Sequence, residues 1–285
     1  DENSGNLITF LEKGKHPPAP IIVYISKDQG ASWNVNPIKI HPDKNGNLPS
    51  MHMNEHGITL KKGKYKGRLL RTTRFYSQSN ERTYWSEHYT NAIFSDNGGK
   101  TWHCSDPFPA NGTGEAAVVE LENGTLYYNS RRHLSTDGLN PRMRHIATST
   151  NGGQSWDNLY VSDELPDGEQ NGDYGLMAGM DRIPFEGHDI LIFSNIESYS
   201  GRKNGTVWLS FDAGKSWPVK KLIDSEGFKY SSLAVGRKNT PSEGYIYLLY
   251  EAGKKRDINA YSGGKIARFN LSWLMEGKNI NQYLR

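Results

Sequence analysis

The sequence predicts an all-β fold, and this prediction depends on a repeated motif, its spacing and the runs that precede it. The motif Ser-x-Asp/Asn-x-Gly-x-Ser/Thr-Trp begins at Ser26, Ser95, Ser149 and Ser210, so its copies lie 69, 54 and 61 residues apart. An apolar, β-prone run precedes each copy (IIVYI, TNAIF, RHIAT and TVWL). A repeat of about 50–60 residues with strand patterning is typical of a β-propeller, in which each repeat forms one blade.

The chemistry of the motif fits a tight turn between two antiparallel strands. Its Asp or Asn can accept hydrogen bonds from the backbone just ahead, and its Gly can adopt a positive φ. The Ser or Thr can bond the polar groups of the turn, while the Trp is expected to pack on the core of its blade. Four of the seven tryptophans are used in this way. We therefore interpret the motifs as structural elements rather than as catalytic ones.

Composition and charge exclude several functional classes. The 30 glycines and 16 tyrosines suit many short strands joined by tight turns. The net charge of +3 comes from 34 basic and 31 acidic residues mixed along the chain, which predicts neither nucleic-acid binding nor a polybasic membrane patch. No apolar run reaches transmembrane length. Cys104 is the single cysteine, so no internal disulfide forms, and no His/Asp/Cys cluster has the spacing of metal ligands, so we expect no metal or organic cofactor.

Residues 1–285 are predicted to form a single domain, because no low-complexity linker divides them. The closing segment ARFNLSWLMEGKNI is expected to be a last strand that passes into a short helical tail. A propeller closes by joining its ends, so this strand is expected to complete the blade that NLITFL begins. The opening DENSGNLITF is typical of an internal segment, and we expect the first blade to be incomplete at the N-terminus.

Several segments between the motifs resemble the sialidase superfamily, in which the repeats are known as Asp boxes or BNR repeats. GEAAVVELENGTLYYNSR is similar to the sialidase segment that holds a catalytic Glu and a substrate-binding Arg, here Glu115 and Arg131. SGRKNGTVWLSFDAGKSW resembles a segment with a second substrate-binding arginine, here Arg202. KYSSLAVG resembles the strand of the nucleophile, here Tyr230, and YIYLLYE ends in Glu251. The resemblance implies a six-bladed β-propeller of four-stranded antiparallel blades and the activity of an exo-α-sialidase.

Elementary chemistry agrees with the roles that this resemblance implies. A carboxylate nucleophile would be repelled by a keto-acid sugar, which carries its own carboxylate on the anomeric carbon, whereas a neutral phenol avoids this repulsion. Tyr230 would then need a base, because a phenol has a pKa of about 10, and Glu115 is expected to take its proton. Sialidases use a tyrosine in this way among glycosidases. Arg131 and Arg202 are expected to bind the substrate carboxylate, and Glu251 to hold a neighbouring arginine in place.

The sequence departs from the family pattern in two places. The family takes its first carboxylate-binding arginine from an Arg-Ile-Pro strand in blade one, but no arginine precedes NLITFL, and the triplet Arg182-Ile183-Pro184 falls two motifs later. The family's acid/base aspartate lies on the loop before the first motif, yet no aspartate lies between Glu12 and Ser26. His16 is on that loop and could act as the general acid near neutral pH.

Three functions remain open at this point. The first is an exo-acting, retaining hydrolase that releases terminal sialic acid or a related keto-acid sugar from glycans. The second is another polysaccharide-active propeller, a uronate-directed hydrolase or a lyase that uses His16 or His88. The third is a non-catalytic carbohydrate-binding propeller. The expected partner is a glycan with a terminal acidic sugar, and we expect a monomer that is secreted, periplasmic or exposed at the cell surface.

Overall fold

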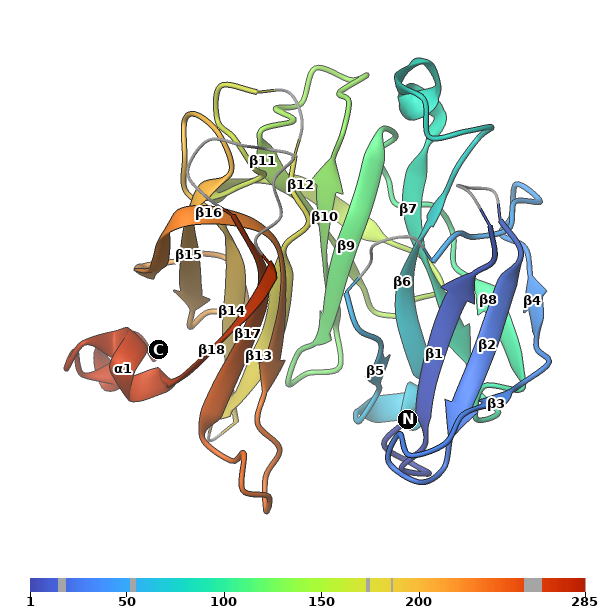
Figure 1. The fold of residues 1–285 in the computed structure, drawn as a ribbon, viewed down its shortest axis with the longest axis horizontal. Coiled ribbons are helices and arrows are strands. Elements are labelled where there is room, and N and C mark those ends of the chain that lie inside the picture. Colours follow the sequence, from blue (N-terminus) through green and yellow to red (C-terminus); the bar gives the residue numbers. More distant parts are fainter. Residues whose placement is uncertain (15–18, 52–54, 173–174, 186, 254–262, 285) are drawn as a thin grey trace. The chain divides into compact units, whose positions relative to one another are not determined.

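The computed structural model describes residues 1–14, 19–51, 55–172, 175–185, 187–253 and 263–284. Apart from one α-helix and three short 3-10 helices, the regular structure in these ranges consists of β-strands, which form four sheets (Figure 1). The all-β prediction is therefore confirmed. Contacts divide the chain into two compact units, residues 1–139 with 146–160 and residues 140–145 with 161–285. Each unit is described by itself, and the single domain stays a prediction.

The first unit contains three groups of strands. A three-stranded sheet has the order β1-β2-β3, and a five-stranded sheet has the order β4-β8-β7-β6-β5. The strands β9 and β10 pair in antiparallel fashion within a sheet of order β12-β11-β10-β9. The bounds are β1 (Leu7–Glu12), β2 (Ile21–Ser26), β3 (Asn34–Val35), β4 (Lys39–His41), β5 (Ile58–Thr59), β6 (Leu69–Phe75), β7 (Tyr89–Ser95), β8 (Thr101–Cys104), β9 (Thr113–Glu120), β10 (Leu126–Arg132), β11 (Met143–Ser149) and β12 (Asp157–Pro166), with 3-10 helices η1 (Gly63–Tyr65) and η2 (Arg82–Glu87).

The second unit is built on a six-stranded antiparallel sheet whose strands follow one another in chain order. Its strands are β13 (Gly179–Phe185), β14 (His188–Ile196), β15 (Lys203–Ser210), β16 (Val219–Val235), β17 (Tyr245–Gly253) and β18 (Gly263–Asn270). The chain then enters α1 (Leu271–Met275), where the Asn270 side chain caps the helix by accepting from the Trp273 N–H, and ends near η3 (Ile280–Gln282). The predicted strand followed by a short helical tail is confirmed.

The 17-residue strand β16 belongs to two groups of strands at once. Its first half pairs with β15, and its second half pairs with β17. Gly227 lies at the changeover and is paired on both sides, to Lys203 and to Gly253. A Cβ at Gly227 would lie 2.2 Å from the carbonyl oxygen of Gly253, so only glycine fits this close approach of backbones. This changeover comes three residues before Tyr230.

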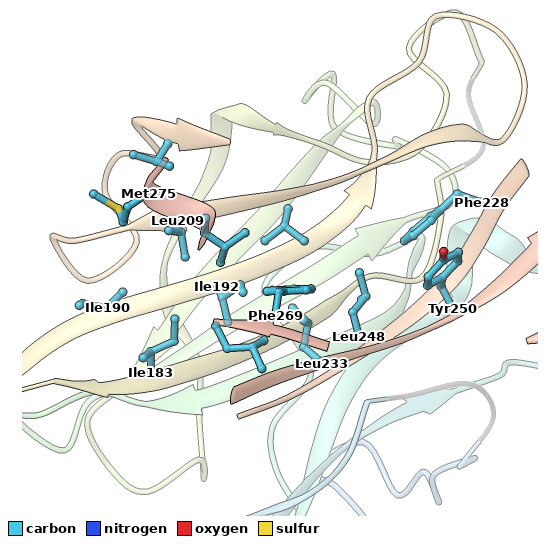
Figure 2. Close-up of a cluster of buried hydrophobic side chains, with 14 of the residues drawn as sticks. Ile183, Ile190, Ile192, Leu209, Phe228, Leu233, Leu248, Tyr250, Phe269 and Met275 are labelled. Atoms are coloured by element: carbon cyan, nitrogen blue, oxygen red, sulfur yellow. The ribbon is translucent and has the colours of Figure 1, made fainter. Parts of the chain in front are cut away.

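Each unit buries apolar side chains between its strands. In the second unit the core gathers residues from β13 to β18 and from α1, including Ile192, Phe228, Leu248 and Met275 (Figure 2). In the first unit one cluster gathers around Tyr128 and Trp156, and a smaller one around Trp102. Alternate residues of the strands supply these side chains, because successive side chains of a strand point to opposite faces.

All four motifs form the predicted turn. In every copy the third residue, Asp or Asn, accepts the N–H of the seventh residue at 2.9–3.1 Å. The first serine accepts the N–H of the fifth residue, a glycine with a positive φ, at 2.8–3.0 Å. The turns connect β2 to β3, β7 to β8, β11 to β12 and β15 to β16. The interpretation of the motifs as hairpin turns is confirmed.

The tryptophans of the motifs differ in burial. Trp102, Trp156 and Trp217 are buried, but Trp33 is 42% exposed. Trp102 packs edge-on against Phe10 of the neighbouring sheet, with ring centres 5.2 Å apart, and thus connects two sheets. The expectation that every copy pins its tryptophan into a core is right for three copies and wrong for Trp33.

Two expectations about the propeller's completeness have different outcomes. The four sheets have three, five, four and six strands, so a propeller of six four-stranded blades is not confirmed. The strand that was expected to complete the first blade is β18, and that expectation is wrong. β18 pairs with β17 along its whole length, while β1 pairs with β2 in another sheet. The register runs from Tyr245–Asn270 to Ala252–Gly263 along one edge of β18, which is the last strand of its sheet.

Replacement of Trp102 by Ala should lower the free energy of unfolding by about 3–5 kcal/mol, because the change empties a buried site between two sheets. The same replacement at Trp33, which stands at the same position of its motif, should cost about 1 kcal/mol or less, since that side chain is already 42% exposed and leaves no closed cavity. Urea unfolding monitored by circular dichroism measures both. Equal losses would contradict the assignment of Trp102 as an inter-sheet contact.

Candidate active site

The predicted site residues fall into two groups. Glu115 in β9 and Arg131 in β10 belong to the first unit. Arg202, just before β15, belongs to the second unit, as do Tyr230 in β16 and Glu251 in β17. His16 lies outside the described residues. The meeting of the two groups at one site stays a prediction, and each group is described within its own unit.

A β-bulge brings Glu115 and Arg131 together. Ser130 pairs with Ala116 and Arg132 pairs with Thr113, so Arg131 alone faces Gly114 and Glu115 across the ladder. Nη1 of Arg131 donates to both carboxylate oxygens of Glu115, at 2.9 and 2.8 Å. Both side chains are buried, with 2% of Glu115 and none of Arg131 exposed. The sequence resemblance therefore named two residues that form one buried ion pair.

His133 and Arg74 extend this pair into a larger polar cluster. Nε2 of His133 lies 3.2 Å from Oε2 of Glu115, and Nη2 of Arg74, in β6, lies 2.7 Å from Nδ1 of His133. The His133 ring packs directly on the backbone of Gly114, where an added Cβ would lie 2.8 Å from the ring. We call Glu115, Arg131, His133 and Arg74, together with Tyr76 and His88, the Glu115 cluster.

Tyr76 and His88 close the cluster around the Arg74 guanidinium. Nη1 of Arg74 donates to the Tyr76 hydroxyl at 3.1 Å, and Nη2 donates to Nδ1 of His88 at 3.0 Å. The guanidinium carbon lies 4.3 Å from the centre of the Tyr76 ring, a cation–π contact. The Tyr76 and His88 rings meet edge-on at 4.8 Å. All three side chains are buried, so this part of the cluster is a rigid support.

Burial and charge set the protonation of the cluster. Burial opposes ionisation of Glu115, yet Arg131 and His133 hold its pKa well below the usual 4.5, so it is a carboxylate at neutral pH. Burial also lowers the pKa of His133 well below 6.5, and the positive charges of Arg131 and Arg74 lower it further. Burial and Arg74 lower the pKa of His88 to about 4. Burial raises the pKa of Tyr76. Both imidazoles are therefore neutral.

A second bulge organises the predicted residues of the second unit. Phe228 pairs with Ala252 and Ser231 pairs with Tyr250, so Tyr230 and its neighbour share one ladder position opposite Glu251. Tyr230 and Glu251 are half-buried, and Oε2 of Glu251 is a buried atom with no hydrogen-bond partner in the described part of the chain. The register brings the predicted nucleophile and the predicted anchor to adjacent strands.

Arg202 lies over the predicted nucleophile. Its guanidinium carbon is 5.6 Å from the centre of the Tyr230 ring. The carbonyl oxygen of Arg202 accepts the N–H of Phe228 at 3.0 Å, which fixes this loop two residues from Tyr230. Gly205 makes the approach possible, because a Cβ there would lie 1.9 Å from the Phe228 ring. Tyr230, Arg202 and Glu251 thus form one group, which we call the Tyr230 group.

Sequence reasoning missed three members of the Glu115 cluster, namely Arg74, Tyr76 and His133. Arg74 lies in β6 and Tyr76 directly follows it, and neither residue belongs to a segment that the resemblance marked as part of the site. Among the other arginines near Arg131, Arg132 pairs with Asp137 and Arg144 with Asp167, so both are structural. The sequence offered one signal for His133, which follows two consecutive arginines after the run GTLYYNS.

Within the described ranges, no three His, Cys, Asp or Glu side chains are grouped as metal ligands. Similarly, none of the helices that the structure describes is long and apolar enough to cross a membrane.

Comparison with known families and proteins agrees with the fold and with the motifs. Residues 3–248 match the BNR repeat-like domain family, so the chain belongs to this family. A sialidase of Micromonospora viridifaciens is 29% identical over 272 residues, which cover 92% of this chain and 37% of that protein. A sialidase of Bacteroides fragilis is 28% identical over 254 residues, covering 84% of this chain and 42% of the other. An anhydrosialidase of Macrobdella decora is 25% identical and is covered over 32% of its length. The chain thus spans less than half the length of these relatives.

Solved structures show the same fold. A Hadza microbial sialidase superposes with a TM-score of 0.69 and 23% identity, over 96% of this chain and 51% of the other. The intramolecular trans-sialidase of Ruminococcus gnavus, in complex with oseltamivir carboxylate, gives a TM-score of 0.67 at 23% identity, over 89% and 51% of the two chains. The chain is therefore all-β and propeller-like, with the sialidase-like BNR superfamily as its structural relatives.

The depressed pKa of Glu115 makes a prediction for stability. A carboxyl whose pKa is lower in the folded than in the unfolded protein contributes stability above the unfolded pKa of about 4.3, and this contribution is lost as the pH falls through the folded pKa. The wild type should therefore have a larger free energy of unfolding than Glu115→Gln at pH 5, and this difference should become smaller as the pH falls to 3. Urea unfolding of both proteins across this range measures it. A constant difference would show that Glu115 is not held ionised by the cluster.

Proposed function

We propose that this chain belongs to an exo-acting, retaining glycoside hydrolase that releases terminal sialic acid or a related keto-acid sugar from glycans. Two observations support the proposal together. The sequence relatives are sialidases, one β-bulge brings Glu115 into contact with Arg131, and a second sets Tyr230 across the ladder from Glu251. Bulges are over-represented next to active sites, where they re-aim side chains.

In this proposal Tyr230 attacks the anomeric carbon, and Glu115 takes the phenolic proton as it does so. The covalent tyrosyl intermediate is then hydrolysed, and two displacements at one carbon give net retention. Glu115 suits the role of a base because it is ionised at neutral pH. Arg202 lies over the Tyr230 ring, where a positive charge would stabilise the developing phenolate.

Recognition of the substrate carboxylate is assigned to Arg131 and Arg202, which stay charged at any working pH. Glu251 opposes Tyr230 across the bulge, and its buried oxygen suits the anchoring of a guanidinium. Protonation of the leaving oxygen is assigned to His16, which precedes the first motif in the sequence, because an imidazole can donate a proton near neutral pH.

The alternative of a lyase with His88 as its base is disfavoured by the environment of that residue. His88 is fully buried, and its Nδ1 already accepts a hydrogen bond from Arg74. A neutral imidazole has one nitrogen lone pair, and here it is on Nδ1, where Arg74 donates, so neither nitrogen is left to accept a proton from a substrate. The non-catalytic binding propeller is the alternative that kinetic measurements decide.

The proposed nucleophile and base are tested by Tyr230→Phe and Glu115→Gln, assayed with a fluorogenic α-sialoside. Loss of a general base typically costs about 10²–10⁴-fold in rate, and loss of the nucleophile should cost at least as much. Tyr199→Phe is the matched control, because Tyr199 is 74% exposed in the same unit as Tyr230, and it should turn over like the wild type. Sugar binding without turnover by the wild type would instead support the binding propeller.

The role of Arg202 predicts a different kinetic pattern. Arg202→Lys keeps the charge but removes the bidentate fork, so KM should rise about tenfold or more for a substrate with a carboxylate. The control is Arg237→Lys at an exposed position of the same unit, which should leave KM unchanged. Steady-state kinetics on the same sialoside measure both. Unchanged KM in Arg202→Lys would remove this residue from the recognition of the substrate.

A further inference from the structure

The His133 imidazole has one tautomer that satisfies its surroundings. Nη2 of Arg74 lies 2.7 Å from Nδ1, and a guanidinium can only donate, so Nδ1 must be the acceptor. Because burial and two nearby guanidinium groups keep this imidazole neutral, its single proton is on Nε2. Nε2 lies 3.2 Å from Oε2 of Glu115. Arg74 thus fixes which atom His133 presents to the carboxylate.

The position of the ring is also fixed by its packing. The His133 ring lies against the backbone of Gly114, the residue before Glu115, and any side chain there would collide with it. The Trp85 ring, from η2, lies 5.2 Å from the imidazole centre. The backbone N–H of His133 donates to the backbone carbonyl of Gly112 at 2.7 Å. Backbone and side chain are therefore both held.

We propose that Arg74 and His133 are positioning residues for Glu115: Arg74 sets the His133 tautomer, and His133 donates to the carboxylate, keeping it ionised and oriented. This inference rests on the proposed function, because it gives the carboxylate its task as a base. Arg131, in β10, stabilises the negative charge of the same carboxylate. His133, which directly follows β10, orients that carboxylate.

The groups that face Glu115 determine the expected pH effect. They are Arg131 from β10, His133 after it, Arg74 from β6 and, beside Arg74, Tyr76 and the neutral His88. Removal of the His133 donor leaves the two guanidinium charges in place, so Glu115 should remain partly stabilised as a carboxylate. Its pKa should nevertheless rise, because a donor to the charged form has been lost.

The substitution pair His133→Leu and His133→Gln separates donation from packing. Leucine fills a similar volume without a donor, whereas the amide of glutamine can place an N–H near the position of Nε2. Gly114→Ala is a second route, since the added Cβ must push the ring away while the imidazole itself is kept. His103→Leu, at an exposed strand position of the same unit, is the control.

The primary measurement is the titration of the Glu115 carboxyl by ¹³C NMR in protein labelled at glutamate Cδ, with the resonance assigned by its absence in Glu115→Gln. We expect the midpoint to rise on the order of one unit in His133→Leu and in Gly114→Ala, to return toward wild type in His133→Gln, and to stay unchanged in His103→Leu. No difference between wild type and His133→Leu down to the pH at which either unfolds would overturn the proposal.

Kinetics then separate failure of this inference from failure of the proposed function. With a turned-over α-sialoside, the acid limb of the kcat profile should move to higher pH in His133→Leu, and KM should change little. If both proteins turn over the sialoside and their kcat–pH profiles have the same acid limb, the positioning role is overturned, whereas the proposed hydrolase activity is still supported. Absence of turnover in the wild type would reject the hydrolase, whereas the NMR titration would still test the contact of His133 with Glu115.

Discussion

The ion pair between Glu115 and Arg131 is the interaction on which the Glu115 cluster depends. A buried carboxylate is unfavourable unless it is paired and hydrogen-bonded, and Nη1 of Arg131 meets both of its oxygens. The bulge at Arg131 makes this geometry possible, because one residue then faces two on the partner strand. Without that pair, burial would favour the protonated form of Glu115, and the His133 N–H would lose its charged acceptor.

The same structural device recurs in the Tyr230 group. The bulge between Phe228 and Ser231 sets Tyr230 opposite Glu251, close to the changeover at Gly227. In a regular ladder, neighbouring side chains alternate between the two faces of a sheet, and an extra residue changes which face a side chain takes. Both groups thus depend on a departure from regular pairing, which local propensity does not encode.

The sequence predicted the turns better than it predicted the closure of the fold. The motifs carry their own hydrogen-bond partners, so Ser26, Asp28 and Gly30 specify a turn without help from the rest of the chain. Whether the tryptophan of a motif is buried depends on the side chains of the neighbouring sheet. Trp102 packs against Phe10 and is buried, whereas Trp33 is exposed. The resemblance to sialidases identified Glu115 and Arg131 as site residues. His133 could be identified only from the structure, in which its ring packs on the backbone of Gly114.

The sharing of β16 has a consequence for dynamics. Strands β15 and β17 both pair with one continuous 17-residue strand, β16, which lies between them in the sheet. Because β15 pairs with the first half of β16 and β17 with the second half, one side can open while the other keeps its partner strand, and the two sides are joined at Gly227. Tyr230 lies in the half of β16 that pairs with β17, so its exposure to local opening is set by that pairing and not by the contacts of β15.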